Sequence, residues 1–143
     1  MFIPLNPIAL FSAALVSFAI GFLWYSPYLF GIEWMKLMKL TPKKLQNQKK
    51  EKNMNLMFVS SFVATLVQAL ILAHVVTYTV NFYSERSLWI GAMTGFWVWL
   101  GFITVTQLNG IFYRNDKPRL FLIETGHQLV SAVIMAVILT MMV

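Results

Sequence analysis

The sequence predicts an all-α integral membrane protein: an antiparallel four-transmembrane-helix bundle with an interfacial amphipathic helix in the first loop. Two observations predict this class. Of the 143 residues, 59% are hydrophobic and only 11% are charged, whereas soluble domains average about 45–50% apolar and about 25% charged residues. The apolar residues also fall into four long runs separated by short polar segments. We treat residues 1–143 as a single membrane domain.

The four apolar runs lie at residues 3–24, 56–80, 88–112 and 120–142. Each reaches the ~20 residues that a helix needs to cross a hydrocarbon core of ~30 Å. Backbone polar groups must be paired within the segment in lipid, so each run is expected to be a helix. The first run has no basic leading segment and no cleavage site before Trp24, and we expect it to be retained rather than removed as a signal peptide.

Basic residues predict the orientation of the helices. Seven of the eleven Lys and Arg residues lie in the first loop, residues 32–53, whereas the second loop has only Arg86. The third loop has three: Arg114, Lys117 and Arg119. Cytoplasmic loops carry the excess of Lys and Arg, so loops 1 and 3 are predicted to be cytoplasmic and both termini outside. The same clustering argues against a nucleic-acid partner, because little basic surface remains elsewhere.

The first loop has structure of its own. Residues 32–40 mix Trp, Met and Leu with Lys, which is typical of a helix lying in the headgroup plane. Thr41 and Pro42 resemble an N-cap and a first helical residue, and a polar helix is expected to run from Pro42 into the second membrane helix. Aromatic and basic side chains nearby are expected to meet lipid headgroups: Trp24, Tyr25, Trp34 and Lys36.

Small residues predict where helices pack, because close approach drives association in lipid. The third run has the pair Gly91 and Gly95, and the fourth has Ala132 and Ala136. We expect these residues to pack the bundle against itself; a homodimer through the glycine pair is the alternative. Four aromatic residues of the third run are expected in the bundle core: Phe96, Trp97, Trp99 and Phe102.

Polar residues inside the membrane are costly, and they are the best candidates for function. In the fourth run Glu124, His127, Gln128 and Ser131 follow a spacing that places them on one helix face. Counting along the antiparallel hairpin places Asn109 level with Glu124, and Gln68 lies near the depth of Gln128. The pattern predicts one polar, ligand-binding centre, made of Glu124, His127, Gln128, Asn109, Gln107 and Gln68.

Two interpretations of this centre remain open. In the favoured, structural one, Arg119 reaches Glu124 and the amides join helices. In the functional one, Glu124 and His127 form a proton-titrating pair along a polar path. No cofactor or metal is expected, because cysteine is absent and the only other histidine, His74, lies at a different predicted depth from His127.

One string of residues is distinctive: Phe-Leu-Trp-Tyr-Ser-Pro-Tyr-Leu-Phe-Gly at 22–31, followed by Trp34 and Leu37-Met38. With Trp-Leu-Gly-Phe at 99–102 and Leu-Phe-Leu-Ile at 120–123, it resembles the bacterial membrane family catalogued as domain of unknown function 1761. The resemblance runs nearly end to end and implies a small four-helix protein of the bacterial cytoplasmic (inner) membrane, with no established activity. In the family pattern an amide stands at the position of Glu124 and a tyrosine at that of His127, so the titratable pair is not a family-wide device.

The function expected from these features is that of an uncharacterised small multi-pass membrane protein. It would bind or transport a lipid or small solute through the polar centre near Glu124, with membrane lipids as partners. The alternative is a non-catalytic accessory or interaction subunit of a larger membrane complex, or a homo-oligomer. An enzyme is the least favoured hypothesis, because the sequence has no Ser-His-Asp set, HExxH motif or carboxylate pair.

Overall fold

The structure is a computed structural model that describes residues 6–51, 53–114 and 116–142. Its elements are α1 (Pro7–Trp24), α2 (Gly31–Leu37), α3 (Pro42–Glu51), α4 (Met54–Tyr83), α5 (Leu88–Val98), the π-helix η1 (Trp99–Thr104), α6 (Val105–Arg114) and α7 (Pro118–Met142). Four helices are long and apolar enough to cross a membrane: α1, α4, the continuous α5–η1–α6 and α7. The prediction of an all-α bundle of four membrane helices is confirmed, and a short helix, α2, lies in the first loop as expected.

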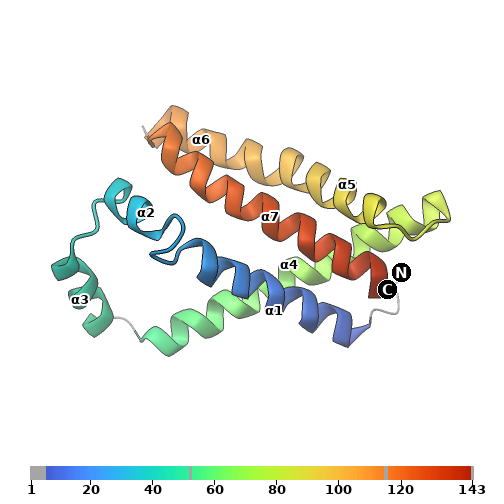
Figure 1. The fold of residues 1–143 in the computed structure, drawn as a ribbon, viewed down its shortest axis with the longest axis horizontal. Helices are drawn as coiled ribbons and strands as arrows, with labels where there is room; N and C mark the ends of the chain where they lie inside the picture. The colour runs from blue at the N-terminus through green and yellow to red at the C-terminus, as the bar shows by residue number, and fades with distance from the viewer. Residues whose placement is uncertain (1–5, 52, 115, 143) are drawn as a thin grey trace.

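The four long helices form an elongated antiparallel bundle around α7 (Figure 1). Helix α7 packs against α1, α4 and α5–η1–α6, and it is the most buried of the four. We call the end with α2, α3 and the α6–α7 turn the basic end. The opposite end, the terminal end, holds the α4–α5 turn and both ends of the described chain, where the Asn6 amide donates to the Met142 carbonyl oxygen over 3.2 Å.

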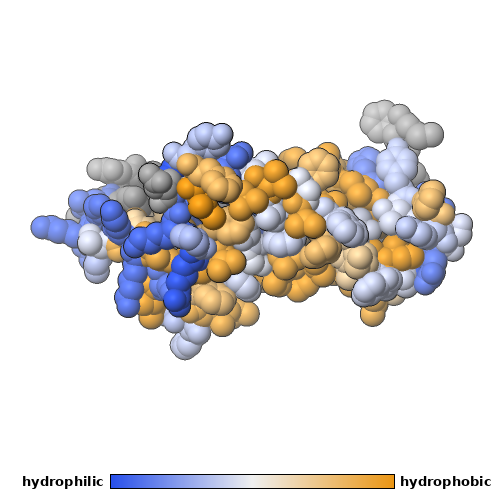
Figure 2. Space-filling model, turned by 90° about the horizontal axis from the view of Figure 1, so that it is seen from above, coloured by the Kyte–Doolittle hydropathy of each residue, from blue (hydrophilic) through white to orange (hydrophobic). Residues whose placement is uncertain are grey.

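The surface follows the same division. Figure 2 shows hydrophilic side chains gathered around the basic end and a band of apolar side chains along the middle of the bundle. An apolar band with charge at its edge is what a membrane-spanning bundle presents to lipid and water.

Side-chain caps set where the helices begin. Asn6 accepts from the Ile8 N–H and Ser87 from the Ile90 N–H, so these polar residues start α1 and α5. Asn53 does the same for α4, accepting from the N–H groups of Asn55 and Leu56. The expectation of a continuous helix from Pro42 into the second membrane helix is therefore wrong. Helix α3 ends at Glu51, and Asn53 starts a new helix because its side chain replaces a backbone acceptor.

Gly31 follows the turn after α1. Its backbone does not need the conformational freedom of glycine, because none of the described glycines has a positive φ. A Cβ at Gly31 would instead collide with the carbonyl oxygens of Tyr25 and Ser26. The Gly31 N–H donates to that Ser26 oxygen over 3.0 Å. Close approach of two backbone segments is what requires glycine here.

The glycine pair of α5 packs against α7. A Cβ at Gly95 would lie 2.6 Å from the Ala132 carbonyl oxygen, and one at Gly91 would lie 2.9 Å from the Val137 Cα. Helix α7 of the same chain thus covers the glycine pair, which leaves it no free surface for the homodimer considered above. The aromatic residues of the same helix differ from expectation: the side chains of Trp97 and Phe102 are 59% and 74% exposed, so they face lipid and not the core.

The core of the bundle lies in its terminal half. Ten buried residues of α1, α4 and α7 form one apolar cluster: Ala9, Ala13, Ala14, Ala69, Leu72, Ala73, Val76, Met135, Ala136 and Leu139. Alanines let the three helices approach closely, and the larger side chains fill the space that is left. Glu124, His127 and Gln128 of α7 lie outside this cluster, toward the basic end.

Candidate functional site

Three tryptophans bind the polar region of α7. We call them the tryptophan clamp: Trp24 of α1, Trp34 of α2 and Trp99 of η1. Their indole nitrogens donate to three consecutive residues of α7, at 3.0 Å to the Ile123 carbonyl oxygen, 3.2 Å to Glu124 Oε1 and 2.8 Å to the Thr125 carbonyl oxygen. A buried indole N–H needs an acceptor, and a helical carbonyl oxygen has a second lone pair to offer. The clamp therefore fixes three elements on about one turn of α7.

The sequence did not reveal the clamp. Trp24 and Trp34 were expected at lipid headgroups and Trp99 in the core, without partners. The available signal was the indole N–H itself, which cannot remain unpaired in an apolar bundle. What the sequence lacks is any indication that two of the three acceptors are main-chain oxygens, since every residue type has one.

Helix α2 is held on α7 by two neighbouring side chains. Trp34 donates to Glu124, and Glu33 forms an ion pair with the Arg119 guanidinium. The expected pairing of Arg119 with Glu124 is therefore wrong: α2 folds back over the start of α7, and its own carboxylate reaches the arginine. Tyr25 packs edge-on against Trp34, with ring centroids 5.3 Å apart, and completes this contact.

A cavity of about 500 Å³ lies between α1, α4 and α7 on the basic side of the apolar core. Its polar lining includes Gln68, His127 and Gln128, and three phenylalanines add apolar surface: Phe18, Phe22 and Phe58. Ser17, Gly21, Tyr25, Ser61 and Thr65 complete it. We call it the α1–α4–α7 cavity. Ligand pockets typically measure about 300–1,000 Å³ and combine apolar surface with a few polar groups, and this cavity has both properties.

His127 lies between the aromatic end of α1 and the cavity. Its ring centroid is 5.3 Å from that of Tyr25 and 6.2 Å from that of Trp24. Its Nε2 is 3.4 Å from Ser131 Oγ, and a Cβ at Gly21 would lie 3.3 Å from the same nitrogen. Glycine at position 21 thus leaves the imidazole the space it occupies. An imidazole can donate or accept, so it can serve a polar group of either kind.

Glu124 belongs to a second, smaller cavity of about 170 Å³ between α6 and α7. Gln107 also lines it, and the Gln107 Oε1 atom is buried without a hydrogen-bond partner in the described structure. Arg114 and Asp116 form an ion pair of 2.8 Å beside these residues. The buried amide oxygen makes this cavity suitable for a donor such as water.

The predicted polar centre is thus two groups of residues and not one. The structure brings Gln68, His127 and Gln128 to the α1–α4–α7 cavity and Gln107 to Glu124, while Asn109 is exposed and lines neither cavity. Counting back from the loop gives the depth of a residue along α6 but not the helix face on which its side chain lies. Gln107 and Asn109 are two residues apart, about 200° around the helix, so when Gln107 lines the cavity beside α7, Asn109 points away from it.

The expected interface residues differ in their surroundings. Lys36 is exposed at the basic end, whereas Tyr25 is half-buried just after α1. Burial raises the pKa of the Tyr25 hydroxyl to about 12, and the nearby Glu124 carboxylate adds to the shift. Both effects disfavour the phenolate.

The remaining histidine shows no link to this region. His74 Nδ1 lies 2.8 Å from the Leu70 carbonyl oxygen of its own helix. Over the described residues, no group of three or more His, Asp or Glu side chains is arranged to hold a metal ion.

Comparisons with known proteins give one family and no individual relative. No curated protein and no solved structure matches the chain. A family match covers residues 8–140, which extends from α1 to α7 and includes the clamp and both cavities. The chain therefore belongs to the family described as Protein of unknown function (DUF1761).

Proposed function

We propose that this membrane protein binds a lipid or a small lipid-like solute in the α1–α4–α7 cavity. The observation that carries the proposal is the two-sided lining of that cavity. Amide and imidazole groups of Gln68, His127 and Gln128 can bind a polar group, while the phenylalanines of α1 and α4 can cover an apolar chain. An amphipathic molecule satisfies both kinds of surface at once.

The position of the cavity supports binding from one side. Its polar groups lie toward the basic end, and the apolar cluster of α1, α4 and α7 fills the terminal half of the same three helices. The alanines of that cluster are fully buried, so α1, α4 and α7 are closely packed there. Binding is therefore the function that this conformation supports, and transport would require the cluster to separate.

Charge at the basic end favours an anionic headgroup. Lys36, Lys39, Lys43 and Lys44 are exposed there, and each such residue contributes about 1 kcal/mol of attraction to an anionic lipid surface. A phosphate oxygen could then accept from the amide groups of the cavity and from the His127 imidazole.

Native mass spectrometry after purification in mild detergent tests the proposal. The wild-type chain is expected to retain an anionic lipid. Ser61→Trp should lose it, because Ser61 lines the cavity and an indole would fill the space. Ser60→Trp is the matched control, since Ser60 is exposed and does not line the cavity; it should retain the lipid. Equal retention by both variants would contradict the proposal, and a lipid-free complex with a partner protein would favour an accessory subunit instead.

We also propose that the basic end faces the cytoplasm of a bacterial inner membrane. The distribution of Lys and Arg supports this, because loops 1 and 3 lie at one end of the bundle. The chain has no native cysteine, so single-cysteine variants report cleanly. In intact cells an impermeant maleimide should label Arg86→Cys but not Lys44→Cys, and the reverse pattern would overturn the orientation.

A further inference from the structure

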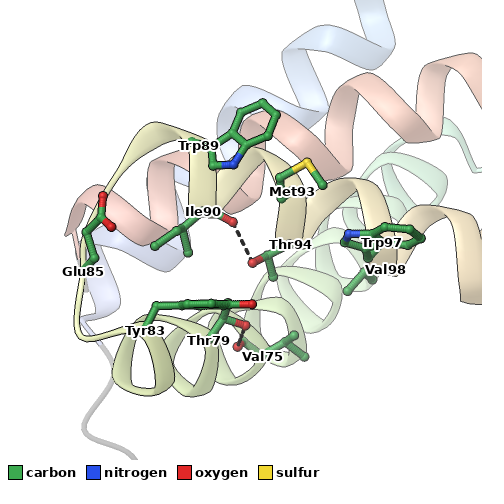
Figure 3. A pocket seen from close by; sticks show the side chains of 10 residues that line it. All are labelled: Val75, Thr79, Tyr83, Glu85, Trp89, Ile90, Met93, Thr94, Trp97 and Val98. Carbon is green, nitrogen blue, oxygen red and sulfur yellow. Dashed lines mark hydrogen bonds between the residues drawn. The ribbon is translucent and has the colours of Figure 1, made fainter.

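Apart from the two cavities described above, a groove of about 460 Å³ lies at the terminal end, between α4 and α5 (Figure 3). Two stripes of side chains line it with a four-residue spacing: Val75, Thr79 and Tyr83 on α4, and Trp89, Met93 and Trp97 on α5. This spacing places each set on one helix face. Because the helices are antiparallel, Tyr83 and Trp89 lie at the same end of the groove, next to Glu85 of the turn (Figure 3).

The groove changes in polarity along its length. Glu85 is at the end by the turn, whereas Val75, Trp97 and Val98 line the other end. The two threonines between them add little polarity, because Thr79 donates to the Val75 carbonyl oxygen over 2.9 Å and Thr94 to the Ile90 carbonyl oxygen over 2.7 Å. The Glu85 carboxylate is thus the one charged group in the lining.

Glu85 also lacks a cationic partner within the described chain, where the ion pairs join Arg114 to Asp116 and Arg119 to Glu33. Next to it, aromatic surface is open to a ligand: the side chains of Tyr83, Trp89 and Trp97 are 62%, 71% and 59% exposed. Aromatic faces attract organic cations, and quaternary ammonium groups are the ligands that such residues recognise. A carboxylate beside aromatic rings is complementary to the same charge.

We infer that the α4–α5 groove binds an amphipathic organic cation, with its ammonium group among Glu85, Tyr83 and Trp89 and its chain along Met93 and Trp97. The length of the groove carries the second half of this inference, because Trp89 and Trp97 are two helical turns apart, about 12 Å. No residue lines both this groove and the α1–α4–α7 cavity. The two sites therefore stand or fall separately.

Calorimetric titration of the purified full-length protein with octyltrimethylammonium, below its micelle concentration, tests the inference. Binding should be saturable and tighter than that of tetramethylammonium, by up to about fourfold for each methylene buried. Octyl sulfate has the same chain and the opposite charge. In the Ser61→Trp variant, whose α1–α4–α7 cavity is filled, it should show no saturable binding. Absence of saturable octyltrimethylammonium binding, or equal binding of octyl sulfate by that variant, would overturn the inference.

Substitutions inside and outside the lining test whether the cation binds in this groove. Glu85→Gln should weaken binding about 2- to 5-fold, as expected for an exposed ion pair, and Trp89→Leu about 3- to 30-fold, as expected for a cation–π contact. Arg86→Gln and Tyr113→Leu are the controls, since both residues are exposed and lie outside the lining; neither should weaken binding. Unchanged affinity in both Glu85→Gln and Trp89→Leu would contradict the assignment.

Two further measurements complete the test. The first identifies whether the cation is a lipid headgroup or a free molecule, and the second shows whether this groove binds independently of the α1–α4–α7 cavity. In nanodiscs, choline phospholipids should compete with octyltrimethylammonium if the natural occupant is a lipid headgroup, and glycerol phospholipids should not; equal affinity in both points to a free amphipathic cation. Ser61→Trp, which fills the other cavity, should leave octyltrimethylammonium binding unchanged. Loss of binding in that variant would contradict a separate site.

Discussion

Glu124 and His127 are three residues apart on α7, yet they line different cavities. The sequence predicted that their spacing would place them on one helix face, which holds for neighbouring turns. The sequence could not predict which neighbouring helix contacts each residue on that face. Trp34 takes a carboxylate oxygen of Glu124, while Tyr25 and Gly21 border His127. The two groups therefore have different partners, and the structural interpretation of Glu124 is favoured, with α2 rather than Arg119 as its partner.

Tyr25 gives a pH-dependent prediction at the level of one residue. Its pKa is raised from 10.0 to about 12, chiefly by burial and then by the Glu124 carboxylate. The unfolded state would release this proton near pH 10, and the folded state only near pH 12, so stability falls as pH rises through that interval. In an absorbance titration of tyrosinate, Tyr25→Phe should remove the step nearest pH 12. Removal of a step near pH 10 instead would show that the hydroxyl is not buried as described.

Gly95 and Gly101 form a matched pair for helix packing. A Cβ at Gly95 would meet the α7 backbone at 2.6–2.7 Å, whereas a Cβ at Gly101 has nothing within 4 Å. Gly95→Ala should lower the free energy of unfolding by about 1–3 kcal/mol, because α5 and α7 must separate. Gly101→Ala should change it by no more than about 0.5 kcal/mol. Reversible unfolding in mixed micelles measures both, and similar values for the two variants would contradict the packing of α5 on α7.

Two short elements, α2 and η1, determine the geometry of the candidate site. The mixture of Trp, Met, Leu and Lys predicted a helix in the first loop, and α2 is that helix. Its docking on α7 could not be predicted, because it depends on where Trp34 and Glu33 meet Glu124 and Arg119. The sequence gives no sign of η1 either. An added residue in a turn changes which side chains face inward without changing hydropathy, and Trp99 of the clamp stands in this turn.

The docking of α2 can be measured by hydrogen exchange. Trp34→Phe keeps a ring beside Tyr25 but removes the N–H that Glu124 accepts. The lost hydrogen bond corresponds to about 1.5–3 kcal/mol for a charged acceptor, so amides of residues 31–37 should exchange more than tenfold faster. Tyr28→Phe is the control, since Tyr28 is 92% exposed. Unchanged protection of α2 in Trp34→Phe would contradict the clamp.

At the scale of the whole molecule, the contact between α1, α4 and α7 is packed in the terminal half of the bundle and hollow toward the basic end. The four membrane helices follow from the length and hydropathy of the apolar runs, which is why their number could be predicted. The asymmetry between the two halves could not. It depends on alanines at the crossing of α1, α4 and α7, and on the space that Gly21, Ser61 and Thr65 leave in the other half. Single residues of these types occur along all the helices, and only their alignment in space distinguishes a core from a cavity.

A single-cysteine accessibility profile along α4 tests this asymmetry most directly. Cysteines replace Thr65 and Gln68, which line the cavity, and Ala73 and Val76, which belong to the core; Ala64, exposed on α4 outside the cavity lining, serves as the control. A small, charged thiol reagent applied at the basic end should modify positions 65 and 68 and leave positions 64, 73 and 76 unmodified. Protection of all five positions would mean a dry bundle without a binding cavity. Modification at 73 and 76 would mean that the terminal half is not closed, and either result would contradict the account.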